Sequence, residues 1–159
     1  MKNILLLLLF ISTSVLAQKQ NEIEKLLNKE LNNELKRISN SSYYGDTLIV
    51  IQPFKIENNV LSLTVKKKSY YDNSFYTERQ EVALDKITTI LKDINVIFET
   101  VEDAVTITQT NTDGEVSIKN YNLFFLQLSA EKNNEDLGQS IVKVFKKSGY
   151  TIEKTYWYD

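Results

Sequence analysis

Apolar residues recur at steps of three and four between residues 20 and 39, and this spacing predicts an amphipathic helix. The apolar positions are Ile23, Leu26, Leu27, Leu31, Leu35 and Ile38. At about 100° per residue they cover roughly half of the helix circumference, which is wider than a two-stranded coiled-coil seam. Acidic and basic side chains alternate on the polar side, which does not favour a membrane-surface helix. We therefore expect this face to pack on a sheet, with a partner-binding or dimerising helix as the alternative.

From about residue 46 to residue 129 the pattern changes to short apolar runs and alternating segments, which are typical of β-strands. The predicted strands cover residues 47–52, 60–66, 74–84, 94–100, 104–110, 115–119 and 121–129. The only proline, Pro53, predicts a strand end or a sheet edge. Short connections predict antiparallel hairpins, among them 94–100 with 104–110, because parallel neighbours need a long crossover. The most apolar strand, 121–129, is expected at the centre of the sheet.

A second helix is predicted for residues 135–148, between an asparagine cap at Asn133 or Asn134 and a stop at Gly149. Its expected buried stripe consists of Leu137, Ile141, Val144 and Phe145. The aromatic tail, residues 150–159, can add a last strand. Together these elements predict the α+β class: an antiparallel sheet or partly open barrel, with an N-terminal amphipathic helix and a C-terminal capping helix.

The first seventeen residues are typical of a secretory signal peptide. Lys2 precedes an unbroken apolar run from residue 4 to residue 11, and Val15-Leu16-Ala17 offers small or modest side chains to a signal peptidase. The apolar run is shorter than the roughly 20 residues that span a bilayer, and no cysteine follows that could carry a lipid anchor. We expect cleavage before Gln18, a single mature domain over residues 18–159, and a periplasmic or extracellular location.

Composition excludes several classes of function. The chain has neither cysteine nor histidine, so Ser-His-Asp and Cys-His catalysis are impossible and zinc, copper and haem lose their usual ligands. Removal of the signal peptide takes Lys2 with it and leaves 18 basic against 21 acidic residues. That weak negative charge argues against a nucleic-acid partner. We expect no catalytic residues, no metal and no cofactor.

Part of the pattern resembles the pleckstrin-homology-like (PH-like) domains of small exported bacterial proteins. The resemblance covers about residues 46–150 and consists of the segment Val82-Ala83-Leu84-Asp85-Lys86-Ile87, two hairpins, the strand from Tyr121 to Leu128 and the helix from Glu135 to Ser148. It implies a barrel closed by the last helix. Members of the family bind phosphoinositides, peptides or proteins, or have no known ligand. No phosphoinositide-type basic loop is recognisable, so no residue role is carried over.

One basic cluster is interleaved with aromatic residues and is a candidate site for a phosphate-bearing or acidic polymer. It comprises Lys66, Lys67, Lys68, Tyr70, Tyr71 and, on the next predicted strand, Arg79. The alternative is a solvated hairpin tip whose lysines prevent edge pairing. A second candidate, a partner or sugar platform, consists of Tyr156, Trp157 and Tyr158, which could instead pack over the sheet.

The densest group of carboxylates, Glu99, Glu102 and Asp103, is interpreted as solvated residues of a connection, although paired acids can also serve glycoside hydrolysis. Asn111 to Glu115 is interpreted as a hairpin turn and not as a calcium loop, because the EF-hand ligand spacing is not met. The expected function is a non-catalytic binding or assembly module for an unknown protein, peptide or apolar ligand. The alternatives are a carrier of a lipid-like ligand held against Leu27, Leu31 and Leu35, and a carboxylate-dependent hydrolase.

Overall fold

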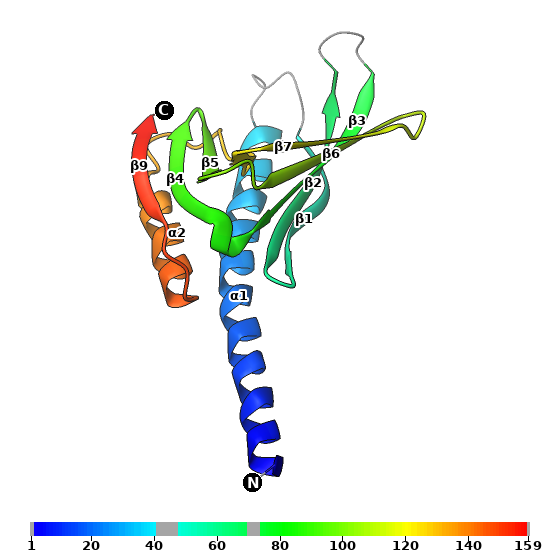
Figure 1. Cartoon of the computed structure of the whole chain (residues 1–159). Helices are drawn as coiled ribbons and strands as arrows, with labels where there is room; N and C mark the ends of the chain where they lie inside the picture. Colours follow the sequence, from blue (N-terminus) through cyan, green and yellow to red (C-terminus); the bar gives the residue numbers. More distant parts are fainter. Residues whose placement is uncertain (1, 41–47, 70–73, 159) are drawn as a thin grey trace.

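The N-terminal helix is longer than its amphipathic pattern. The computed structural model of the chain describes residues 2–40, 48–69 and 74–158, and side chains of the first helix from Gln20 onward. Helix α1 (Lys2–Ser39) continues without a break through the predicted signal peptide. Its N-terminal half projects beyond the other elements, whereas its C-terminal half lies beside the sheets (Figure 1). None of the helices in the described ranges is long and apolar enough to span a membrane.

Five antiparallel strands form the larger sheet. They are β1 (Ile49–Glu57), β2 (Val60–Lys68), β3 (Phe75–Ala83), β6 (Val105–Asn111) and β7 (Val116–Tyr121), in the order β1-β2-β3-β6-β7. Strand β1 runs through Pro53, which lies within the second of two register shifts at the edge of the sheet. A proline is tolerated there because an edge strand and its bulges do not need every N–H for the ladder. Pro53 therefore marks the edge, as predicted, and not the end of the strand.

The second sheet contains four strands: β4 (Ile87–Asp93), β5 (Asn95–Thr100), β8 (Leu123–Phe125) and β9 (Glu153–Tyr158), in the order β8-β5-β4-β9. The short 3-10 helix η1 (Leu84–Lys86) leads from the first sheet into β4. Strand β9 runs parallel to β4, because helix α2 (Glu135–Lys147) lies in the connection that precedes it and supplies the crossover that a parallel neighbour requires. The α+β class is confirmed, in the form of two sheets that do not close into a barrel.

Two strand predictions are wrong, and one strand was not predicted. The predicted hairpin of 94–100 with 104–110 does not form, since β5 pairs with β4 and β8 while β6 pairs with β3 and β7. The segment 121–129 is not a central strand. It divides between the end of β7 and the three-residue edge strand β8, and its buried Leu126 and Leu128 follow in irregular backbone interrupted by the positive φ of Gln127. Strand β4 lay outside the predicted set.

Both sheets and both helices contribute to one hydrophobic core. The apolar stripe of α1 lies in it, with Ile23, Leu27 and Leu31 nearly inaccessible to solvent. From α2 the core receives Ile141 and Phe145, and Phe145 packs against Phe98 with ring centroids 5.2 Å apart. The prediction that both helices pack against sheet is therefore confirmed.

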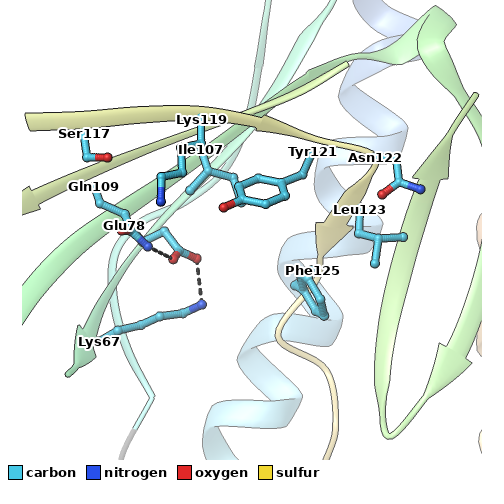
Figure 2. Close-up of a pocket in the computed structure, with 10 residues that line it drawn as sticks. All are labelled: Lys67, Glu78, Ile107, Gln109, Ser117, Lys119, Tyr121, Asn122, Leu123 and Phe125. Carbon is cyan, nitrogen blue, oxygen red and sulfur yellow. Dashed lines mark hydrogen bonds and ion pairs between the residues drawn. The ribbon is translucent and has the colours of Figure 1, made fainter. Parts of the chain in front are cut away.

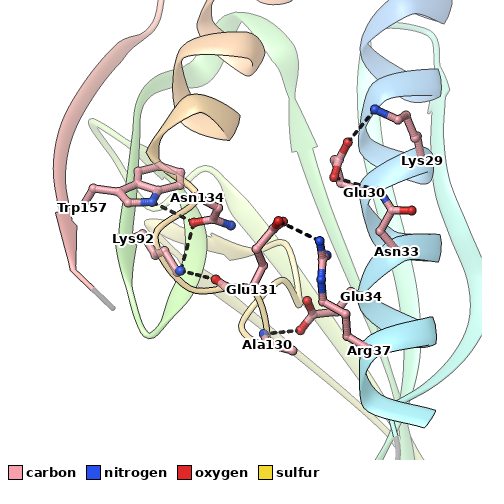
Figure 3. A network of polar contacts seen from close by, with 10 residues as sticks. All are labelled: Lys29, Glu30, Asn33, Glu34, Arg37, Lys92, Ala130, Glu131, Asn134 and Trp157. Carbon is pink, nitrogen blue, oxygen red and sulfur yellow. Dashed lines mark hydrogen bonds and ion pairs between the residues drawn. The ribbon is translucent and has the colours of Figure 1, made fainter. Parts of the chain in front are cut away.

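A polar network ties the C-terminal part of α1 to the segment between β8 and α2 (Figure 3). The buried carboxylate of Glu34 accepts hydrogen bonds from the backbone N–H groups of Ser129 at 2.7 Å and Ala130 at 2.6 Å. Nearby, Arg37 pairs with Glu131 at 2.7 Å. These contacts fix a segment with little regular structure directly against the helix.

The same segment is tied to the second sheet at the start of α2 (Figure 3). The buried Nζ of Lys92 donates to the carbonyl oxygen of Glu131 at 2.6 Å and to Oδ1 of Asn134 at 3.0 Å. Asn134 Oδ1 also accepts from the indole N–H of Trp157 at 2.9 Å. Asn134 is the N-cap residue, as predicted, but its side chain makes no capping bond because it joins β4 to β9.

Candidate functional site

A pocket of about 250 Å³ opens between the five-stranded sheet and β8 (Figure 2). Strands β2, β3, β6 and β7 contribute one wall, and Asn122 with β8 contributes the other. The lining residues are Lys67, Glu78, Ile107, Gln109, Ser117, Lys119, Tyr121, Asn122, Leu123 and Phe125. The pocket thus combines apolar side chains with carboxylate, amide, hydroxyl and amine groups.

Strand alternation explains why these side chains meet. Alternate residues of β3 face the interior, and they change from apolar Val82 in the core through Gln80 to Glu78 near the outer end. Register places Gln109 of β6 opposite Glu78 and Lys119 of β7 opposite Ile107. The inner face of the sheet is therefore a core wall at one end and a polar wall at the other.

Gln80 holds the opposite wall in place. Its side chain is fully buried, and its amide exchanges two hydrogen bonds with the backbone of Phe125, accepting from the N–H at 3.0 Å and donating to the carbonyl at 3.3 Å. A buried amide with both functions satisfied fixes its partner in one orientation. The pairing attaches β8 to β3 and sets the position of the Phe125 ring in the pocket.

Glu78 is a buried acid, and each of its two oxygens accepts a hydrogen bond. One oxygen accepts from Lys67 Nζ at 2.6 Å and the other from Gln109 Nε2 at 3.0 Å (Figure 2). On the neighbouring inner-face position, burial and, second, the negative charge of Glu78 raise the pKa of Tyr76. Because Glu78 accepts these two hydrogen bonds, we assign it a structural role and not that of a general base.

Lys119 is the cation of the pocket that remains available. Its side chain is exposed, and within the described part of the chain no partner is found for its amine. Lys67 is neutralised by Glu78, so the lining carries one uncompensated positive charge. Tyr121, 44% exposed, lies on the same face of β7 at the next alternate position.

Strand β7 is also an edge of the sheet, and none of the described strands pairs with its outer side. All six of its residues are exposed, its pairing with β6 shows no register shift, and Val116 and Ile118 are 59% and 65% exposed. The opposite edge, β1, is shielded by α1, because Asn28 donates to the carbonyl of Phe54 and Glu24 accepts from the N–H of Ile56. The sheet therefore has one edge that a helix covers and one edge that is exposed.

The predicted basic cluster is divided between the two faces of the sheet. Lys66 lies on the outer face, 4.7 Å from the centroid of the Phe75 ring, whereas Lys67 points into the pocket. Lys68 returns to the outer face and is exposed. Strand alternation separates neighbours in this way. Tyr70 and Tyr71 fall outside the described residues.

Arg79 also lies on the outer face, away from Lys67. Its guanidinium donates to Gln52 and Glu81, each at 2.9 Å. The hydrogen bond that Arg79 donates to Glu81 is the main cause that raises the pKa of Arg79. These partners hold Arg79 to its own sheet, and the four described residues of the cluster do not form one basic surface.

The three aromatic residues of the C-terminal tail also alternate between the two faces of their strand. Tyr156 and Tyr158 are exposed and stacked, with ring centroids 5.4 Å apart. Trp157 points the other way, is half-buried, and lies directly over Gly138 of α2. Two of the three platform residues are thus presented to solvent, and the third belongs to the packing of β9 on α2.

The predicted carboxylate group does not form a cleft. Glu102 and Asp103 are exposed in the connection from β5 to β6, and Glu99 lies at the end of β5. Across the described ranges, no group of three or more acidic residues could hold a metal ion. The turn prediction is confirmed, since Asn111 Oδ1 accepts from the N–H groups of Asp113 and Glu115 between β6 and β7.

The sequence interpretation missed most of the pocket. A period-two reading of β3 as Tyr76, Glu78, Gln80 and Val82 would have shown polar residues continuing a core face, which is the available signal. The contribution of Phe125 could not be found in this way, because it depends on β8 crossing to the other sheet. Comparison of the chain with protein-family models, curated proteins and solved structures found no match. The PH-like resemblance stays a prediction.

Proposed function

We propose that this chain is an exported, non-catalytic assembly module that docks through the free edge of β7. The observation that carries the proposal is the difference between the two edges of the five-stranded sheet. Strand β1 has a proline, register shifts and a covering helix, all of which prevent strand addition. Strand β7 is regular and exposed, with apolar Val116 and Ile118 on its outer face, and such an edge is a template for another strand.

The backbone of β7 determines which residues can receive a partner. The carbonyl of Glu115 accepts from the N–H of Asn111, so Glu115 directs its groups toward β6. In an antiparallel ladder this direction alternates, which leaves the N–H and C=O groups of Val116, Ile118 and Asn120 on the free side. An added strand would bind these three residues.

We propose a second copy of the chain as the occupant, because β7 is complementary to itself. A two-fold axis through Ser117 pairs Val116 with Ile118 of the partner subunit in both directions, and both are apolar. The same register brings Lys119 opposite Glu115 of the partner subunit, which gives two ion pairs. Cross-strand apolar and opposite-charge pairs each favour a sheet register.

Neighbouring registers are less favourable. An axis through Lys119 would set two ammonium groups directly opposite each other, which disfavours pairing. An axis through Ile118 would leave both Val116 and Lys119 opposite uncharged polar residues. The short strand implies a small interface, so we expect weak, concentration-dependent dimerisation.

The other hypotheses receive less support. The carrier hypothesis needs space beside Leu27 and Leu31, but both side chains are packed in the core. The hydrolase hypothesis needs converging acids in a cleft, and Glu102 and Asp103 are exposed on a connection. Export is supported by the N-terminal sequence pattern alone.

Sedimentation equilibrium of residues 18–159 tests the proposal across a concentration series that extends to millimolar protein. We expect a monomer–dimer equilibrium, weakened by Lys119→Glu or Glu115→Lys and restored when both changes are present. Ile118→Pro should abolish the dimer and retain the fold, since the N–H it removes faces solvent. A protein that stays monomeric throughout, or whose dimer ignores all four variants, would contradict the proposal.

A further inference from the structure

We propose that the pocket behind β7 binds a small carboxylic acid with an aromatic group. The pocket shares Lys119 with the proposed dimer, in which this side chain faces Glu115 of the partner subunit, so the ligand is expected to bind the monomer. The argument rests on the size of the pocket, on its apolar wall and on its charge.

Size limits the ligand to a small molecule. A volume of about 250 Å³ corresponds to roughly eight waters at about 30 Å³ each. That is sufficient for one aromatic ring with a short chain, and it lies just below the range of about 300–1,000 Å³ typical of drug-sized ligands. Long alkyl chains would extend into solvent.

The apolar wall is built for a flat group. The backbone of Phe125 is fixed by two hydrogen bonds to Gln80, so the strand that carries its ring into the pocket needs little reorganisation when a ligand binds. Leu123 and Ile107 extend the apolar surface, and Tyr121 adds a second aromatic side chain. Rings favour offset or edge-to-face contact with other rings, which makes an aromatic group the best match.

Charge selects an anion. Glu78 is paired with Lys67 and also bound by Gln109, so its negative charge is already compensated and does not favour a cationic ligand. Lys119 supplies an available ammonium, and Ser117 and Asn122 add polar groups to the lining of the same pocket. One lysine with no arginine suits a carboxylate better than a phosphate, which is typically held by several cationic donors.

Nuclear magnetic resonance titration of residues 18–159 with 3-phenylpropanoate tests the proposal, with the uncharged 3-phenylpropanamide as the matched ligand. We expect backbone shifts at β7, at Gln109 and at Leu123–Phe125, and tighter binding of the acid than of the amide. Lys119→Gln should weaken acid binding about fivefold, because the loss of one charge pair costs about 1 kcal/mol of binding free energy. The same change should leave amide binding unchanged. Lys68→Gln, on the outer face of the same sheet, is the control lysine.

Two further variants distinguish ligand binding in the pocket from formation of the proposed dimer. Glu115→Gln removes the ion pair of the dimer but lies outside the pocket, and Ile118→Pro blocks strand addition. At micromolar protein, well below the concentrations at which the weak dimer is expected, both variants should bind the acid as the parent chain does. Equal affinity for acid and amide, shifts that cluster away from the pocket, or no binding of either compound would each overturn the proposal.

Discussion

Asn134 shows how the role of one residue depends on partners that lie far away in the chain. Its position at the start of α2 predicts a capping side chain, yet its Oδ1 accepts from Lys92 and Trp157. Gln80 and Glu34 behave similarly, since each satisfies backbone groups more than 40 residues away. Sequence patterns reveal polar residues at such positions, but not which distant donor or acceptor makes their burial favourable. For that reason the polar half of the pocket was missed.

Gly138 is the clearest single-residue test of the packing of β9 on α2. A methyl group there would lie 2.6 Å from the Trp157 ring and 3.0 Å from the Lys154 side chain. Gly138→Ala should therefore destabilise the fold by about 1–3 kcal/mol, as overpacking does. Trp157 is the only tryptophan, so its fluorescence should shift to longer wavelength. In a helix without this contact, the same change would stabilise by about 1 kcal/mol. A higher denaturation midpoint would thus contradict the contact.

Glu34 provides a test of the polar network. Glu34→Ala leaves the N–H groups of Ser129 and Ala130 without their acceptor, and a buried unsatisfied donor costs about 1–3 kcal/mol. Glu22→Ala is the matched control on the same helix, because Glu22 is exposed and forms only a surface pair with Lys25. Urea denaturation should separate the two variants. Similar midpoints would show that Glu34 does not hold the segment after β8.

At the scale of elements, the periodicity of apolar residues was sufficient to predict the helices and most of the strands. It failed at β4, because the turn from β4 to β5 contains no glycine or proline. Ile94 occupies that turn with a φ of 63° and is exposed, an unusual conformation for a β-branched residue. It failed again at 121–129, where a long apolar run was interpreted as one strand. The run crosses between sheets at Asn122, and no local signal marks that change.

The stripe of α2 can be tested at its most buried member. Phe145 is fully buried between Phe98 and Tyr150. Phe145→Ala should lower the free energy of unfolding by about 3–5 kcal/mol, the usual cost of emptying a buried phenylalanine site. Lys143→Ala on the exposed side of the same helix should change it by less than about 0.5 kcal/mol. If guanidinium midpoints for the two variants coincide, α2 is not part of the core.

At the scale of the whole molecule, the arrangement of two sheets was beyond sequence reasoning. The connection from β5 to β6 is short enough for a hairpin, yet it joins two different sheets. Pairing partners are chosen by the total apolar area that the fold buries, and this quantity is not a property of a local segment. The N-terminal helix, by contrast, was correctly assigned to the core, because its wide apolar face could be buried only against a larger surface.

Two truncations test where the folded body begins. The described side-chain contacts of α1 start at Gln20, which donates to Asn59 at 3.1 Å and to the Tyr150 hydroxyl at 3.0 Å. A chain that begins at Gln18 retains these contacts, so we expect its free energy of unfolding to match that of the full chain within about 0.5 kcal/mol.

A chain that begins at Asn40 loses Ile23, Leu27 and Leu31 from the core, at about 2–5 kcal/mol for each large apolar side chain. Since single domains are stable by only about 5–15 kcal/mol, this second chain should fail to fold cooperatively and should bind a dye specific for exposed apolar surface. Circular dichroism melting curves of the two truncated chains provide the measurement. If the chain that begins at Asn40 folds cooperatively as a monomer, the helix serves a partner and not its own core. If the chain that begins at Gln18 is strongly destabilised, the result argues against a signal peptide that ends at Ala17.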